Sequence, residues 1–157
     1  MKTTTKKRIL IIGITAAIIA TVIGFAKGRQ NTYGELLSVS FYIGSFHDGY
    51  TTYRVEKRGD EVFFEAENKT LELDIYEKVN QDILDDLNTI IHENNIIAWR
   101  DYKGSDDEVS DGHSFGFTAI YKIGKIEASG WYNMHPKEYK EGVLALKDYF
   151  ERLLAGL

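Results

Sequence analysis

The fold is decided by residues 36–66, which read LLSVSFYIGSFHDGYTTYRVEKRGDEVFFEA. Apolar residues such as Val39 fall on one parity of this stretch, and polar residues such as Ser40 fall on the other. Asp48-Gly49 is a typical β-hairpin turn, and Arg58-Gly59-Asp60 marks a second turn. The pattern predicts successive strands of an antiparallel sheet that is apolar on one face and solvated on the other.

A fourth strand, a helix, a second hairpin and a last helix are expected to follow. The first helix should begin at Asn80, a good N-cap residue, and the last at Pro136. Residues 100–112 show no periodicity and predict a polar loop, and the second hairpin is expected at 114–121 and 126–132. The predicted order is ββββ-α-ββ-α, which is an α+β domain with an antiparallel sheet and two helices packed on one face. The apolar stripes of the two helices are Ile83, Leu87, Ile90 and Ile91, and Tyr139, Val143, Leu146, Phe150 and Leu153.

The N-terminal part of the chain has a different character. Residues 9–26 read ILIIGITAAIIATVIGFA and carry no charge. A helix of this length spans roughly 27 Å, close to the thickness of the bilayer hydrocarbon. The sequence therefore predicts a membrane segment at 9–26. Residues 1–30 would form a basic tail and a signal-anchor helix, and residues 31–157 one extracytoplasmic domain.

The basic residues around this segment predict its orientation. Residues 6–8 are all basic, whereas only Lys27 and Arg29 follow the apolar run closely. The positive-inside rule places the N-terminus in the cytoplasm and the domain outside a single-pass protein of the cell membrane. Gly24-Phe25-Ala26 also fits a signal-peptidase site, so the alternative is cleavage after Ala26 and secretion of the domain.

Composition excludes several classes of function. Of the 19 basic residues of the chain, residues 1–30 hold six and no acid. Residues 31–157 thus carry thirteen basic residues against 24 acidic ones, a net charge of −11, which argues against a nucleic-acid partner. The absence of cysteine excludes a disulfide framework, thiol catalysis and a cysteine-ligated zinc site.

Motifs for metal binding and catalysis are weak. An EF-hand starting at Asp107 would need oxygen ligands at its third and twelfth positions, where the sequence has Val109 and Thr118. An irregular calcium site in this acidic loop, or a metal shared by His113 and His135, stays open as an alternative to a plain solvated loop. No serine lies in a G-x-S-x-G setting. The sequence predicts no catalytic residue, no metal ligand and no cofactor.

The outer face of the predicted sheet carries several large side chains. Exposed aromatic groups close to one another are typical of surfaces that contact a protein, peptide or glycan. The alternative is that these rings pair across strands, or lie under the 100–112 loop, and only stiffen the sheet. Tyr42, Arg54 and Phe63 come from three successive strands, so we expect them to lie close together and exposed. The candidate binding residues are Tyr42, Tyr50, Arg54, Phe63 and Trp131.

The last third of the chain resembles a group of small, uncharacterised, membrane-anchored bacterial proteins, many from Gram-positive organisms. The resemblance rests on Trp99, the run Asp111-Gly112-His113-Ser114-Phe115, Ser129-Gly130 and Pro136. It implies a bacterial source and a compact fold, and it implies no catalytic residues. The glycines and the proline also have structural roles available, in turns, close packing and a helix start.

Three functions are compatible with these features. The first is a binding or interaction module of unknown ligand, anchored in the membrane by residues 9–26 and displayed outside the cell. The second is an inhibitor or immunity-type protein whose acidic surface neutralises a basic partner. The third is a small cell-envelope hydrolase, which would need polar residues converging in a pocket.

Overall fold

The first four strands form the predicted meander. The computed structural model describes residues 33–105, 112–131 and 134–157. Strands β1 (Leu36–Ser45), β2 (Gly49–Arg58), β3 (Glu61–Asn68) and β4 (Leu73–Val79) are neighbours in chain order, and each pairs antiparallel with the next. The turns lie at Asp48-Gly49 and around Gly59, where positive φ angles of 74° and 66° favour glycine. The predicted hairpins are therefore confirmed.

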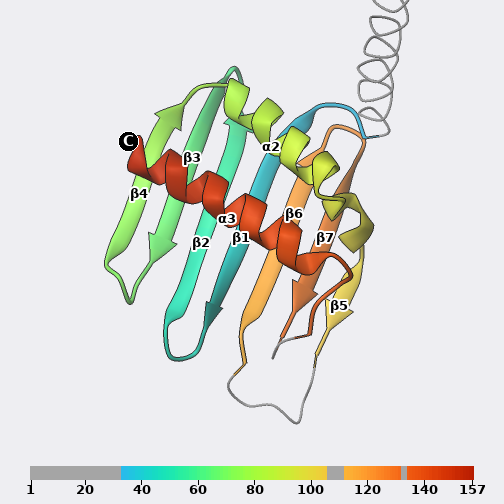
Figure 1. Ribbon diagram of the computed structural model, residues 1–157. Coiled ribbons are helices and arrows are strands. Elements are labelled where there is room, and N and C mark those ends of the chain that lie inside the picture. Colours follow the sequence, from blue (N-terminus) through green and yellow to red (C-terminus); the bar gives the residue numbers. More distant parts are fainter. Residues whose placement is uncertain (1–32, 106–111, 132–133) are drawn as a thin grey trace, which may run out of the picture. The chain divides into compact units, whose positions relative to one another are not determined.

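Three further strands extend the sheet from the other side of β1. Strand β6 (Ser114–Tyr121) pairs antiparallel with β1, and β7 (Gly124–Gly130) pairs antiparallel with β6. The edge strand β5 (Tyr102–Gly104) runs parallel to β7. The seven-stranded sheet thus has the order β4-β3-β2-β1-β6-β7-β5 (Figure 1), and β1 joins its two halves.

Strand β5 corrects the prediction of a loop throughout 100–112. The segment is held at the sheet edge by main-chain bonds at both ends: Asp101 N–H donates to Glu127 O (2.8 Å), and Trp131 N–H donates to Gly104 O (3.0 Å). Three residues are too few to show an alternating pattern, so tertiary contacts decide this strand. Residues 106–111 of the predicted loop lie outside the described residues.

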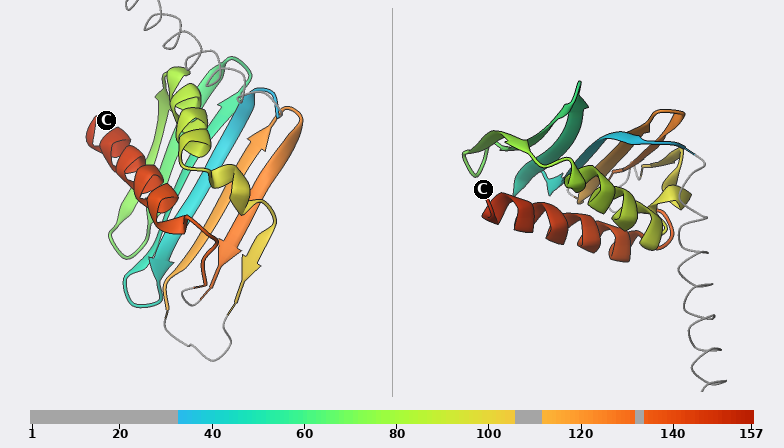
Figure 2. Two further views of the ribbon diagram at one scale, coloured as in Figure 1. Left: turned by 45° about the vertical axis from the view of Figure 1, so that its right-hand side comes forward. Right: turned by 90° about the horizontal axis from the view of Figure 1, so that it is seen from above.

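Helices α2 (Asp82–Glu93) and α3 (Tyr139–Ala155) both cover one face of the sheet, as expected (Figures 1 and 2). A short 3₁₀ helix, η1 (Ile96–Trp99), returns the chain toward the core and buries Trp99 completely. Apolar side chains of the inner sheet face meet the stripes of the two helices there. The largest fully buried side chains are Trp99, Phe41, Phe64, Phe115, Phe117 and Phe150.

Both helices begin later than predicted. The side chain of Asn80 does accept a hydrogen bond from Asp82 N–H (3.1 Å), but the helix itself starts at Asp82. Helix α3 starts at Tyr139 instead of Pro136, because Glu138 has a positive φ of 56° that no helix residue adopts. Local capping signals mark a helix start only to within a few residues.

At the beginning of β1, the residue that points into the core also differs from the predicted alternation. The register shifts between Leu36 and Ser38, so Leu37 is an extra residue in the strand. Leu36 is therefore buried in the core while Leu37, predicted to point inward, is only partly buried. From Val39 onward the predicted alternation holds.

The predicted membrane segment, residues 9–26, lies outside the described residues. Residues 33–157 form a compact unit of their own. Within the described ranges, no helix is long and apolar enough to cross a membrane.

Candidate functional site

The outer sheet face, which no described helix covers, has two unlike halves. Over β2, β3 and β4 its charged groups pair with one another. Phe63 stacks on Tyr76 with ring centroids 5.4 Å apart, and the guanidinium of Arg58 lies 5.8 Å from both ring centroids. Most charged and aromatic groups of this half thus have a partner among the described residues, with Asp74 as an exception. The ion pairs are Arg54–Glu65, Arg58–Glu56, Lys78–Glu61 and Lys69–Glu67.

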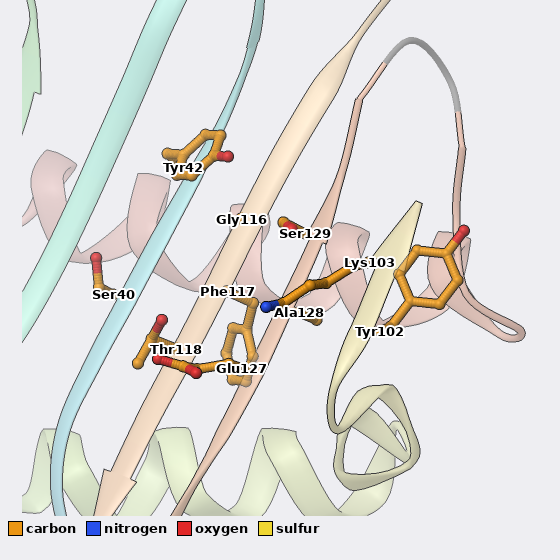
Figure 3. Close-up of a pocket in the computed structure, with 10 residues that line it drawn as sticks. All are labelled: Ser40, Tyr42, Tyr102, Lys103, Gly116, Phe117, Thr118, Glu127, Ala128 and Ser129. Carbon is orange, nitrogen blue, oxygen red and sulfur yellow. The ribbon is translucent and has the colours of Figure 1, made fainter. Parts of the chain in front are cut away.

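The other half, over β1, β6 and β7, is built from small side chains. Its floor holds Ser40 of β1, Gly116 and Thr118 of β6, and Ser129 of β7. These small residues leave a hollow of about 360 Å³, whose lining side chains are drawn in Figure 3. Glycine within a strand commonly marks a place where another group approaches the backbone closely.

The middle ring of a row of three aromatic side chains, Tyr42, lines this hollow. Tyr42 of β1 lies 6.2 Å from Tyr50 of β2 and 6.5 Å from Trp131, between ring centroids. The Tyr42 ring covers Gly116, because a Cβ at that position would stand only 2.0 Å from Tyr42 Cε1. Burial, and to a lesser degree the nearby Tyr50, raises the pKa of Tyr42, so this phenol stays neutral at physiological pH. We call Tyr50, Tyr42 and Trp131 the aromatic row.

A second hollow lies on the β2–β3 side of the row. It has a volume of about 310 Å³ and is lined by Tyr50, Thr52, Glu67 and residues of the two adjoining turns. The Tyr42–Tyr50 pair borders both hollows, since Tyr42 lines the first and Tyr50 the second. The aromatic row therefore stands between two depressions.

One cation that lines the larger hollow has no ion-pair partner in the described part of the chain. Figure 3 shows Lys103 reaching from β5 toward the middle of the hollow, on the side of Glu127 and Thr118. Glu127 pairs with Lys125 at 2.8 Å, whereas Lys103 has no ion-pair partner among the described residues. Among the described residues, Lys103 is thus a cation without an ion-pair partner in a domain that is strongly acidic overall.

The structure brings together three of the five predicted binding residues. Tyr42, Tyr50 and Trp131 form the aromatic row, and Trp131 is 43% exposed. Arg54 is exposed but paired with Glu65, and Phe63 is half-buried under the Arg58–Tyr76 contact. Of the three residues expected to lie close together, Tyr42 and Phe63 lie apart and Arg54 lies between them, because Arg54 faces Ser40 on β1 and Glu65 on β3.

The strand register explains why Tyr42 and Phe63 lie apart. Tyr42 faces Thr52 on β2, and Thr52 faces Glu67 on β3, four residues from Phe63. At strand spacings of about 4.8 Å and a rise of about 3.3 Å per residue, some 16 Å separate Tyr42 from Phe63. Parity assigns a residue to a face, but only the register places it along the strand.

Sequence reasoning missed the residues that form the hollow itself. No local sequence motif marks these small residues or Lys103 as part of a site. Serine, threonine and glycine do recur at outer positions of both β1 and β6. That recurrence is the pattern that would have indicated a depression. The sequence predicts a loop at Lys103, because no local pattern indicates β5.

The two histidines considered for a metal site do lie near each other. Burial lowers the pKa of His135, a backbone hydrogen bond involving Met134 offsets part of that effect, and the charge of His113 lowers it further. The ring of His135 stacks on Tyr139 at 4.0 Å. Within 33–105, 112–131 and 134–157, no group of three or more possible ligands is placed to hold a metal ion.

Fold and site together define a class: an α+β domain whose seven-stranded, mostly antiparallel sheet is covered by two helices on one face and carries a hollowed aromatic site on the other. No protein-family model matches the chain, and no curated protein matches it.

Proposed function

We propose that the domain is a binding module and that its ligand occupies the larger hollow beside the aromatic row. The contrast between the two halves of the outer face carries this proposal. The β2–β4 half pairs most of its charges and stacks Phe63 on Tyr76, whereas the β1–β6–β7 half has the larger of the two hollows described, half-exposed rings and Lys103, which has no ion-pair partner among the described residues. Clustered aromatic groups at the edge of a depression are typical of binding surfaces.

We further propose that residues 9–26 anchor this module in the cell membrane, with the domain outside. The uncharged run and the basic residues before it support this placement. The ligand would then belong to the cell envelope or its surroundings. A tethered module would meet such a ligand at high effective concentration, so modest affinity would suffice.

Matched alanine variants test the proposal. Tyr42→Ala and Trp131→Ala remove two rings of the row, and Tyr76→Ala removes an aromatic ring of comparable exposure from the paired half. The assay measures co-sedimentation of purified residues 31–157, which lack the proposed anchor, with envelopes of cells that lack the gene.

Wild type and Tyr76→Ala should sediment with the envelopes, and both row variants should lose most of that binding while they remain folded by circular dichroism. Equal binding of all four proteins, or a loss confined to Tyr76→Ala, would refute the proposed site.

A further inference from the structure

We infer that the ligand of the hollow is an acidic glycan: a short oligosaccharide that carries carboxylate or phosphate groups. This inference rests on the proposed function and names the chemistry of the ligand. Three independent features lead to it, namely the state of the main chain under the hollow, the free hydroxyl groups of its floor and the charge of Lys103.

The strands under the hollow are paired on both sides, so their main-chain N–H and C=O groups form the hydrogen bonds of the sheet. Strand β1 pairs with β2 and β6, β6 with β1 and β7, and β7 with β6 and β5. A peptide that binds along a sheet gains its affinity from main-chain hydrogen bonds at a free edge. On this face such a peptide would leave its own N–H and C=O groups without partners, and each buried unpaired group costs about 1–3 kcal/mol. The hollow therefore disfavours an extended peptide.

The floor offers side-chain hydroxyl groups instead. Ser40, Thr118 and Ser129 line the hollow, and their hydroxyl groups have no hydrogen-bond partner within the described part of the chain. A hydroxyl both donates and accepts, which suits a ligand that is itself rich in hydroxyl groups. Sugars meet this condition, whereas an apolar ligand would bury these groups unpaired.

The aromatic row adds surfaces for the apolar faces of sugar rings. Its rings follow one another at 6.2 and 6.5 Å across β2, β1 and the end of β7. They are inclined at 75° and 52°, so they do not form one flat platform but present separate ring faces and edges. Axial C–H groups of successive sugars can pack against such rings. The row is long enough for an oligosaccharide and exceeds what a single sugar would need.

The charge of the hollow selects an acidic glycan over a neutral one. Lys103 lines the hollow without an acid partner among the described residues, while Glu127 is already paired with Lys125. The domain as a whole repels anions, with a net charge of −11 over residues 31–157. A locally unpaired cation in such a domain is complementary to an anionic group, and a charge-assisted hydrogen bond would hold it.

The test uses the full-length chain in a detergent without a sugar headgroup, because a glycoside detergent would compete for the site. Backbone amide NMR shifts report where a probe binds. The probes are short oligogalacturonates and phosphorylated gluco-oligosaccharides, uncharged oligosaccharides of equal length, and a set of acidic and proline-rich peptides. The variants are Lys103→Gln and, as the matched control on the paired half of the same face, Lys78→Gln.

At least one acidic oligosaccharide should shift amides of β1, β6 and β7 around the hollow, and its uncharged counterpart should bind more weakly. Lys103→Gln should weaken acidic binding about tenfold, the size expected for one charge-assisted hydrogen bond, and Lys78→Gln should leave it unchanged. Comparison of the oligogalacturonates with the phosphorylated oligosaccharides shows whether the preferred acidic group is a carboxylate or a phosphate.

Three outcomes overturn the inference: no acidic oligosaccharide of the panel binds, the uncharged ones bind as well as the acidic ones, or Lys103→Gln has no effect. If a peptide instead shifts the amides of the hollow, the glycan is wrong but the proposed binding site stands. If envelope binding depends on the aromatic row while no probe binds, the inference fails and the proposed function survives.

Discussion

At the scale of single residues, Phe150 holds the helix layer to the sheet. Its ring is fully buried and stacks on Tyr53 at 4.9 Å, with Phe41 and Phe64 at 6.3 and 6.2 Å. These three partners come from β1, β2 and β3. One side chain of α3 therefore contacts three adjacent strands.

Truncation of this ring should be costly. Phe150→Ala is expected to lower the free energy of unfolding by about 3–5 kcal/mol, through lost burial and the cavity left behind. Leu144→Ala on the same helix, where the side chain is 49% exposed, should change it by less than about 0.5 kcal/mol. Denaturant unfolding of residues 31–157 measures both. A loss below about 1 kcal/mol for Phe150→Ala would show that α3 does not dock as described.

Gly116 and Tyr42 should be energetically coupled. A methyl group at position 116 would collide with the Tyr42 ring, so Gly116→Ala should destabilise the wild-type domain. In a Tyr42→Ala background the collision is absent, and the same substitution should be neutral or stabilising by about 0.5–1 kcal/mol, as alanine usually is relative to glycine in a strand. A double-mutant cycle from unfolding curves should give a coupling energy of about 0.5–3 kcal/mol. Equal effects in both backgrounds would mean that Tyr42 does not cover Gly116.

At the scale of elements, the turn between β3 and β4 depends on one buried amide. Asn68 is 2% exposed, and its Oδ1 accepts from the N–H groups of Thr70 (2.9 Å) and Leu71 (3.1 Å). Its Nδ2 donates to Thr51 Oγ1 at 2.7 Å and so ties this turn to β2. The side chain thus replaces main-chain bonds that the turn cannot make.

Loss of this amide should loosen the edge of the sheet. Asn68→Ala is expected to cost about 1–3 kcal/mol, because it leaves two turn N–H groups and the Thr51 hydroxyl without partners. Lys69→Ala, in the same turn with a side chain 91% exposed, is the control and should be nearly neutral. Hydrogen exchange should show faster opening of β4 in Asn68→Ala alone. Unchanged exchange would exclude this role.

The elements also show why part of the fold was predictable and part was not. Alternation and turn residues define β1 to β4 locally, and the 3.6-residue spacing defines both helices. The strand β5 and the start of α3 depend on contacts with distant segments, which no local pattern contains. The same division applies to the site: parity put all five predicted residues on one face, but only the register shows that Phe63 lies two strands and four residues away from Tyr42.

At the scale of the whole molecule, a basic, apolar N-terminal sequence precedes an acidic domain with one sheet face covered by helices and one that no described helix covers. We propose that this second face lies outside the cell and that a ligand occupies its larger hollow. The chain has no cysteine, so a single introduced cysteine can be labelled without background. Ser129 lines the hollow, and Lys78 lies on the paired half of the same face.

The most direct test labels Ser129→Cys and Lys78→Cys with a membrane-impermeant maleimide, on intact cells and on purified protein. For each site, the labelling rate on intact cells is divided by the rate on purified protein, so that the different exposures of the two side chains cancel. Lys78→Cys should react at similar rates in both settings, whereas Ser129→Cys should react clearly more slowly on cells, where the ligand covers the hollow. Labelling of both sites only after lysis would contradict the external location, and equal ratios for both sites on intact cells would contradict an occupied hollow.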